Sequence, residues 1–123
     1  MILRTYARIF VASLDQSLPL LEKLVGRPAD LRFPFDQVEI AAVGDFLVVA
    51  GDQQALNPMR EAVGPVVVED LDETIRELID AGATIDQPVS RSVTGSFAYL
   101  RHPDNSLVEY VQWSPELVTR IIT

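Results

Sequence analysis

The feature that most constrains the fold is an order of predicted elements that occurs twice. Each copy has a strand, an amphipathic helix and three further strands, and an acidic Ser-Leu-Asp or Asp-Leu-Asp triplet follows the first strand at the same place. Internal repetition of this kind is typical of a duplicated structural unit. The sequence therefore predicts an α+β fold of two tandem βαβββ modules.

The predicted elements are bounded by turn and capping residues. In the first copy they are a strand over 5–11, a helix over 14–25, and strands over 31–35, 37–43 and 46–50. In the second copy they are a strand over 65–69, a helix from Asp70 or Asp72 to Ala81-Gly82, and strands over 83–87, 96–101 and 107–112. A short helix over 115–122, with Ser114 as its N-cap, is expected at the C-terminal end.

We expect one domain, 1–123, because the chain is long enough for one substantial core and short for two. Module one covers about 1–51, a polar linker about 52–62 and module two about 63–113. Apolar residues at helical spacing should face the core from both helices. They are Leu14, Leu18, Leu21, Leu24 and Val25 in the first helix, and Leu71, Ile75, Leu78 and Ile79 in the second.

The charge balance narrows the possible partners. Acidic residues outnumber basic ones by 18 to 10, which disfavours nucleic acid and anionic membranes. The same charge favours a cationic small molecule by electrostatic steering, although it also fits an ordinary acidic bacterial protein. The chain has no cysteine, no signal-peptide pattern and no apolar run of transmembrane length, so we expect a cytoplasmic protein.

Several short motifs resemble the vicinal oxygen chelate superfamily, which includes glyoxalase I, extradiol dioxygenases and bleomycin-resistance proteins. The matching segments are 13–18 and 21–26 in the first module, and 69–72, 81–83, the turn His102-Pro103-Asp104-Asn105 and Glu109 in the second. The resemblance covers almost the whole chain. It implies curved mixed sheets that enclose a cavity, and a homodimer.

The same resemblance points to a chain that has lost its metal ligands. By spacing, Tyr6 occupies the first histidine position of the metal enzymes, and Val63 or Gly64 occupies the second. Only the last ligand is kept, as Glu109. The single histidine, His102, lies in a turn and is expected to be a turn residue. One carboxylate and a phenol make a poor metal site, so we expect no metal and no cofactor.

Strand alternation then suggests which side chains line a ligand site. Tyr6, Arg8 and Phe10 share one face of the first strand, while Glu109 shares its face with Leu107, Val111 and Trp113. Phe97 and Tyr99 share a face of the preceding strand with Arg101, and the resemblance places Tyr99 at a substrate contact of the fosfomycin-resistance proteins. For Phe10 and Phe97, core filling is an equal alternative. The facing of Arg32, Phe33 and Phe35 is left open.

Three functions fit this set of residues. The first is a metal-independent protein that binds an aromatic or hydrophobic organic molecule, for antibiotic or toxin resistance. The second is a metal-independent isomerase or lyase with Glu109 as general acid or base. The third is a protein-interaction domain with a vestigial cavity. In the first two, we expect Arg8 to supply the counter-charge of Glu109.

Overall fold

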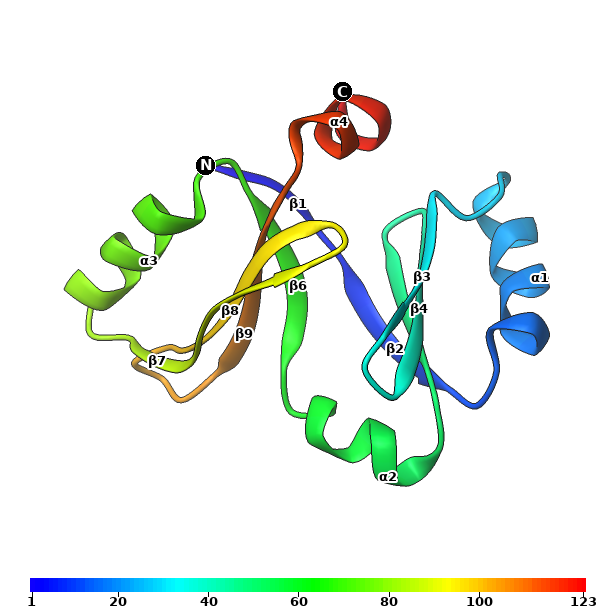
Figure 1. The fold of residues 1–123 in the computed structure, drawn as a ribbon, viewed down its shortest axis with the longest axis horizontal. Helices are drawn as coiled ribbons and strands as arrows, with labels where there is room; N and C mark the ends of the chain where they lie inside the picture. Colours follow the sequence, from blue (N-terminus) through cyan, green and yellow to red (C-terminus); the bar gives the residue numbers. More distant parts are fainter. The chain divides into compact units, whose positions relative to one another are not determined.

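The computed structural model describes all 123 residues, Met1–Thr123. The chain divides into two compact units, one formed by 1–5 together with 62–123 and the other by 6–61. Each unit contains one curved mixed sheet with a helix packed on one of its faces (Figure 1). The α+β fold with duplicated βαβββ topology is confirmed.

The duplication is visible in the strand order of the two sheets. The sheet of residues 6–61 has the order β2-β5-β4-β3, and the other has the order β1-β6-β9-β8-β7. In both, the first strand of the module runs parallel to its fourth, and the remaining neighbours are antiparallel. The second sheet differs by the additional edge strand β1.

The unit of residues 6–61 follows the predicted elements closely. Its elements are β2 (Ala7–Val11), α1 (Leu14–Val25), β3 (Leu31–Phe35), β4 (Val38–Val43), β5 (Phe46–Ala50), α2 (Gln53–Leu56) and the 3-10 turn η1 (Asn57–Met59). Helix α1 begins at the predicted place because the Ser13 hydroxyl accepts a hydrogen bond from the Gln16 N–H at 3.4 Å. It ends at Gly26, whose φ of 90° suits a residue without a side chain.

The other unit contains the second module and both ends of the chain. Its elements are β1 (Ile2–Thr5), β6 (Val63–Val68), α3 (Leu71–Asp80), β7 (Thr84–Ser92), β8 (Gly95–Arg101), β9 (Leu107–Trp113), α4 (Pro115–Leu117) and the π-helical turn η2 (Val118–Ile122). The Asp70 carboxylate caps α3 by accepting from the Glu73 N–H at 3.0 Å. Ser114 caps α4, as predicted.

The single first strand predicted over 5–11 is wrong. The chain instead forms β1 and β2, with Tyr6 between them, and the two strands belong to different sheets. β1 pairs with β6, so that Thr5 stands opposite Val66. β7 is also longer than expected, because its pairing with β8 continues to Ser92 opposite Gly95.

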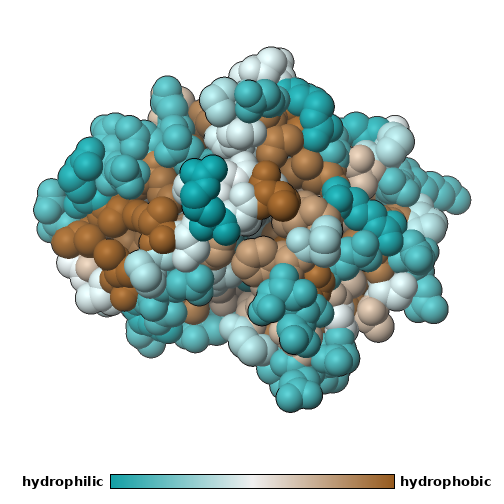
Figure 2. Space-filling model, viewed as in Figure 1, coloured by the Kyte–Doolittle hydropathy of each residue, from teal (hydrophilic) through white to brown (hydrophobic).

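Each helix buries one stripe against its own sheet. Leu14 and Leu18 of α1 pack on Ala41, Val43, Val48 and Ala50, while Leu71 and Ile75 of α3 pack on Val66, Val68, Ala98, Leu100, Val108 and Tyr110. The inward positions predicted for Leu24 and Ile79 are wrong, because these side chains are 71% and 44% exposed. A hydrophobic area over α3 is visible in Figure 2. None of the helices has the length and apolar character needed to cross a membrane.

Candidate functional site

The candidate site lies on the face of the β1-β6-β9-β8-β7 sheet that points away from α3. Val108 and Tyr110 of β9 contact the helix, so the alternate residues of this strand point to the opposite face. They are Leu107, Glu109, Val111 and Trp113. Of these, only Glu109 carries a charged group. It is half-buried, while the other three side chains are buried. A carboxylate in such surroundings needs a hydrogen-bond donor or an opposite charge.

The pairing of β8 with β9 brings the predicted aromatic residues beside Glu109. Tyr99 stands directly opposite Glu109, and Phe97 stands opposite Val111. The rings of Phe97 and Tyr99 meet edge to face, with their centroids 6.2 Å apart. Cross-strand partners share a face of the sheet. The structure therefore places Phe97, Tyr99, Glu109 and Trp113 on one face, as the sequence suggested.

The β6 strand opposite Glu109 carries no side chain that could bind a metal. Val63 is paired with Val108 and Val66 with Tyr110, so Gly64 and Pro65 both stand opposite the single residue Glu109. This is a β-bulge. A Cβ atom at Gly64, whose φ is 103°, would lie only 2.9 Å from the Glu109 carbonyl oxygen and 2.9 Å from the Val66 nitrogen.

Neither candidate for the second metal ligand therefore fits that role. Val63 shares the side of Val108, which contacts α3, and Gly64 has neither a side chain nor space for one. No group of three or more His, Cys, Asp or Glu side chains could hold an ion. The residues present therefore do not fit the divalent metal of the metal enzymes that the sequence resembles.

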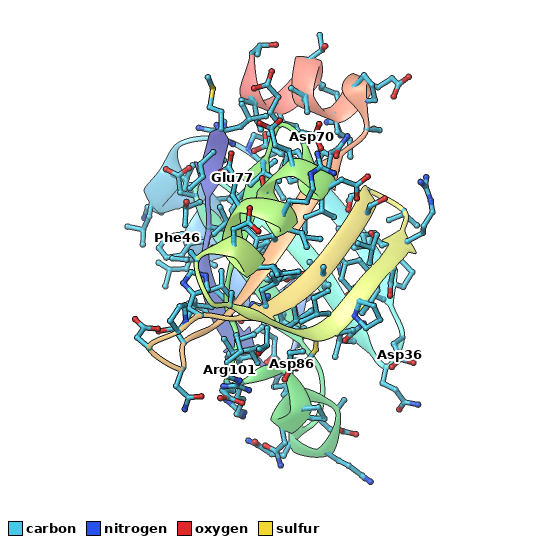
Figure 3. The ribbon with its side chains drawn as sticks, turned by 90° about the vertical axis from the view of Figure 1, so that its left-hand side faces the viewer. Asp36, Phe46, Asp70, Glu77, Asp86 and Arg101 are labelled. Atoms are coloured by element: carbon cyan, nitrogen blue, oxygen red, sulfur yellow. The ribbon has the colours of Figure 1, made fainter.

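One guanidinium marks the end of the same face. Arg101 lies two residues beyond Tyr99 on β8, next to Asp86 of β7 (Figure 3). Its Nη2 atom lies 3.5 Å from the Asp86 carboxylate, and its Nη1 atom donates to the Asn105 carbonyl at 3.1 Å. Arg101 thus links the β8–β9 turn to the edge strand β7. Sequence reasoning also missed Val67 and Arg4, which share this face through the pairing of β1, β6 and β9.

Tyr6, Arg8 and Phe10, the other predicted ligand-binding residues, belong to the unit of residues 6–61. Tyr6, which precedes β2 in the sequence, is buried. Arg8 donates to the Met59 carbonyl at 3.3 Å, and the guanidinium carbon of Arg60 lies 5.1 Å from the Phe10 ring centroid. The linker thus contacts both side chains. The ion pair expected between Arg8 and Glu109 stays a prediction.

The register of β3 settles the facing that the sequence left open. Arg32 is paired with Ala41, on the α1 side, and its guanidinium bonds Asp15 at 2.9 Å and Glu39 at 3.1 Å. Phe33 is paired with Ile40 and therefore points to the opposite side. Phe35 follows the same alternation. Phe33 and Phe35 thus lie on the face of this sheet that points away from α1.

His102 is a turn residue, as predicted, with a contact that the sequence did not indicate. Its N–H donates to the Ser106 carbonyl, and its Nε2 atom lies 2.7 Å from the Tyr110 hydroxyl oxygen. The two rings are parallel, with centroids 5.9 Å apart. Burial raises the pKa of Tyr110. In the same turn, the Ser106 N–H donates to Asp104 at 3.0 Å, which lowers the pKa of that carboxyl.

Several solved structures share the fold of this chain. No family model and no curated protein matches the sequence. An uncharacterized protein from Methanosarcina mazei is 35% identical over 93% of this chain and 94% of that one, with a TM-score of 0.88. Methylmalonyl-CoA epimerase from Mycobacterium tuberculosis is 18% identical over 96% and 93%, with a TM-score of 0.73. The Streptomyces coelicolor epimerase, in a variant complexed with 2-nitronate-propionyl-CoA, is 16% identical over 94% and 97%, with a TM-score of 0.68.

These neighbours show that the chain has the fold of the methylmalonyl-CoA epimerases. The chain belongs to the same family as the Methanosarcina mazei protein.

Proposed function

We propose that the protein binds a flat, largely apolar organic molecule, without a metal, on the face that carries Phe97, Tyr99, Glu109 and Trp113. The observation that carries this proposal is a half-buried carboxylate that lies between the buried Leu107 and Val111 along its face of β9 and opposite Tyr99 of β8. Sites for small organic ligands combine apolar and aromatic walls with a few polar groups that fix orientation. The Glu109 carboxylate can accept a hydrogen bond from a ligand N–H or O–H.

The charge of the chain favours a neutral or cationic ligand over an acyl-CoA. The phosphates of coenzyme A need cationic partners, whereas this chain has a net charge of −8. Arg101, on the same face, already pairs with Asp86. Sequestration of a toxic molecule or antibiotic is the biological role that tight binding without turnover would serve.

A titration with naphthol tests this proposal. Trp113 is the single tryptophan, so its indole N–H gives one signal in a nitrogen–proton correlation spectrum. We expect this signal to shift in a saturable way, and Tyr99→Leu to weaken binding by about fivefold through loss of ring contact. Arg76→Gln, on the exposed side of α3, is the control and should change nothing. An unchanged Trp113 signal, or equal binding by Tyr99→Leu, would contradict the proposal.

The register of Tyr99 with Glu109 also favours a second candidate, a metal-independent isomerase. The Glu109 carboxylate would remove a proton from the carbon next to a carbonyl, and the Tyr99 hydroxyl would donate a hydrogen bond to the enolate oxygen. Return of the proton from Glu109 completes the exchange. Incubation of carbonyl compounds in deuterium oxide tests this. Deuterium uptake that Glu109→Gln abolishes would support the enzyme, and uptake unaffected by Glu109→Gln would contradict it.

The homodimer implied by the family resemblance is also proposed for this chain. Two curved sheets of this size leave strand edges that a second copy can cover. Light scattering at micromolar concentration should give the mass of a dimer, and a monomer mass would contradict it.

A further inference from the structure

The edge strand β7 adds a polar residue to the face of Glu109. Gln87 stands opposite Tyr99 in the β7–β8 pair, and Tyr99 stands opposite Glu109 in the β8–β9 pair. Because cross-strand partners share a face, Gln87, Tyr99 and Glu109 form one polar row across three strands. The β7 register shifts on both sides of Gln87, between Ile85 and Gln87 and between Gln87 and Ser90.

The neighbouring row on this face is apolar at its centre. Ser90 stands opposite Phe97, Phe97 opposite Val111, and Val111 opposite Val67. Phe97 and Val111 are each 5% exposed, and Val67 is fully buried. A polar row therefore runs beside a row whose centre is made of buried apolar side chains.

The side chain at the outer end of the polar row, Gln87, is the most exposed of the three. Glu109 and Tyr99 are half-buried, whereas Gln87 is exposed at the edge of the sheet. Neighbouring strands are about 4.8 Å apart, so the backbone positions of Glu109 and Gln87 are separated by about 10 Å. That separation suits a small planar molecule whose two ends each meet one of the polar side chains.

We propose that Gln87 is a ligand-binding residue and that the site takes a planar molecule with a hydroxyl or N–H donor at one end and a carbonyl at the other. This inference rests on the proposed function. The carboxylate of Glu109 only accepts hydrogen bonds and selects the donor end, while the Gln87 carboxamide has two N–H donors for the carbonyl. Tyr99 lies between Gln87 and Glu109. Its ring contacts the ligand, and its hydroxyl can hydrogen-bond the polar group at either end of the ligand.

Three related compounds test the assignment. Umbelliferone has a hydroxyl and a lactone carbonyl at opposite ends, coumarin lacks the hydroxyl, and naphthol lacks the carbonyl. Affinities are measured by the Trp113 indole signal at a pH below the hydroxyl pKa of umbelliferone. We expect Gln87→Leu to weaken umbelliferone and coumarin by about fivefold and to leave naphthol unchanged, because only the first two offer a carbonyl.

The control is Arg91→Leu, on the same edge strand. Arg91 is exposed and stands opposite Ser96, on the other face of β7 from Gln87, so this variant should bind all three compounds normally. If naphthol binds and Gln87→Leu affects all three compounds equally, or none, the role of Gln87 is wrong while the proposed function stands. If none of the three compounds binds, the proposed function fails and the assignment of Gln87 fails with it.

Discussion

The two sheets share one strand order but differ on the face that their own helix leaves uncovered. In the unit of residues 6–61, that face has Arg8 and Phe10, and both contact the linker at Met59 and Arg60. In the other unit, the face has a carboxylate beside three aromatic rings. The duplicated topology therefore provides the same scaffold twice, and the residues on the second face determine what each copy does.

The first strand of each module shows how a local change accompanies this difference. β2 pairs with β5 without interruption from Ala7 to Val11. β6 is bulged at Gly64-Pro65, opposite Glu109. A bulge disrupts the local ladder and increases the twist of the strand. The bulge opposite Glu109 is thus a feature of the second sheet that the β2–β5 pair lacks.

The largest expected effect comes from the leucine that begins each helix. Leu14 and Leu71 are 1% and 2% exposed, and each packs on the sheet of its own unit. Leu14→Ala and Leu71→Ala should each lower the free energy of unfolding by about 2–5 kcal/mol in urea denaturation. A cost below about 1 kcal/mol for either variant would show that the two modules are not stabilised in the same way.

The bulge can be tested with a pair of glycines. Both Gly64 and Gly26 have positive φ, but a Cβ at Gly64 meets two backbone atoms, whereas at Gly26 nothing lies within 4 Å. Gly26→Ala should cost about 1 kcal/mol for backbone strain alone, and Gly64→Ala about 2–3 kcal/mol. Thermal unfolding measures both. Equal costs would mean that the close approach of a Cβ at Gly64 to the Glu109 carbonyl oxygen does not destabilise the fold.

The helix caps give a smaller comparison. Asp70 caps α3 with a hydrogen bond of 3.0 Å, and Ser13 caps α1 with one of 3.4 Å. Each should lose about 1 kcal/mol on substitution by alanine, with the larger loss at Asp70 because its charge also interacts with the helix dipole. Urea denaturation measures both losses of stability. High salt should reduce the difference between them, because it screens the charge of Asp70. A larger loss of stability for Ser13→Ala than for Asp70→Ala would contradict this prediction.

The smallest effect concerns Tyr110, which has no counterpart with this contact in the other unit. Burial raises the pKa of Tyr110 above the ordinary value of 10.0 for tyrosine, so the folded chain holds the proton more tightly than the unfolded chain. Its contribution to stability is complete below the unfolded pKa and is lost as the pH rises through the folded pKa. Tyr110→Phe should therefore reduce the alkaline loss of stability. An identical alkaline profile in both proteins would contradict this.

The sequence was sufficient for the features that depend on local pattern. The duplicated order, the caps at Ser13 and Asp70 and the alternation along β9 follow from residue type and period, which short-range physics determines. The face of Glu109, Phe97, Tyr99 and Trp113 could be predicted for the same reason. The pair Gly64-Pro65 within a strand is also a sequence signal of a bulge.

The remaining features depend on pairing between distant segments. The break at Tyr6 arises because Ile2–Thr5 pairs with β6, more than fifty residues away in the sequence, and no local pattern specifies that choice. The facing of Arg32 follows from its register with Ala41. Gln87 lies in an exposed, irregular strand without periodicity, so only its pairing with Tyr99 connects it to the site.

A crystal structure of the complex with naphthol tests the central claim most directly. Our account predicts that the ring lies against Phe97 and Tyr99, with its hydroxyl donating to Glu109. Naphthol bound only to residues of the unit 6–61, or only on the α3 side of the second sheet, would contradict the assignment of the ligand site to this face.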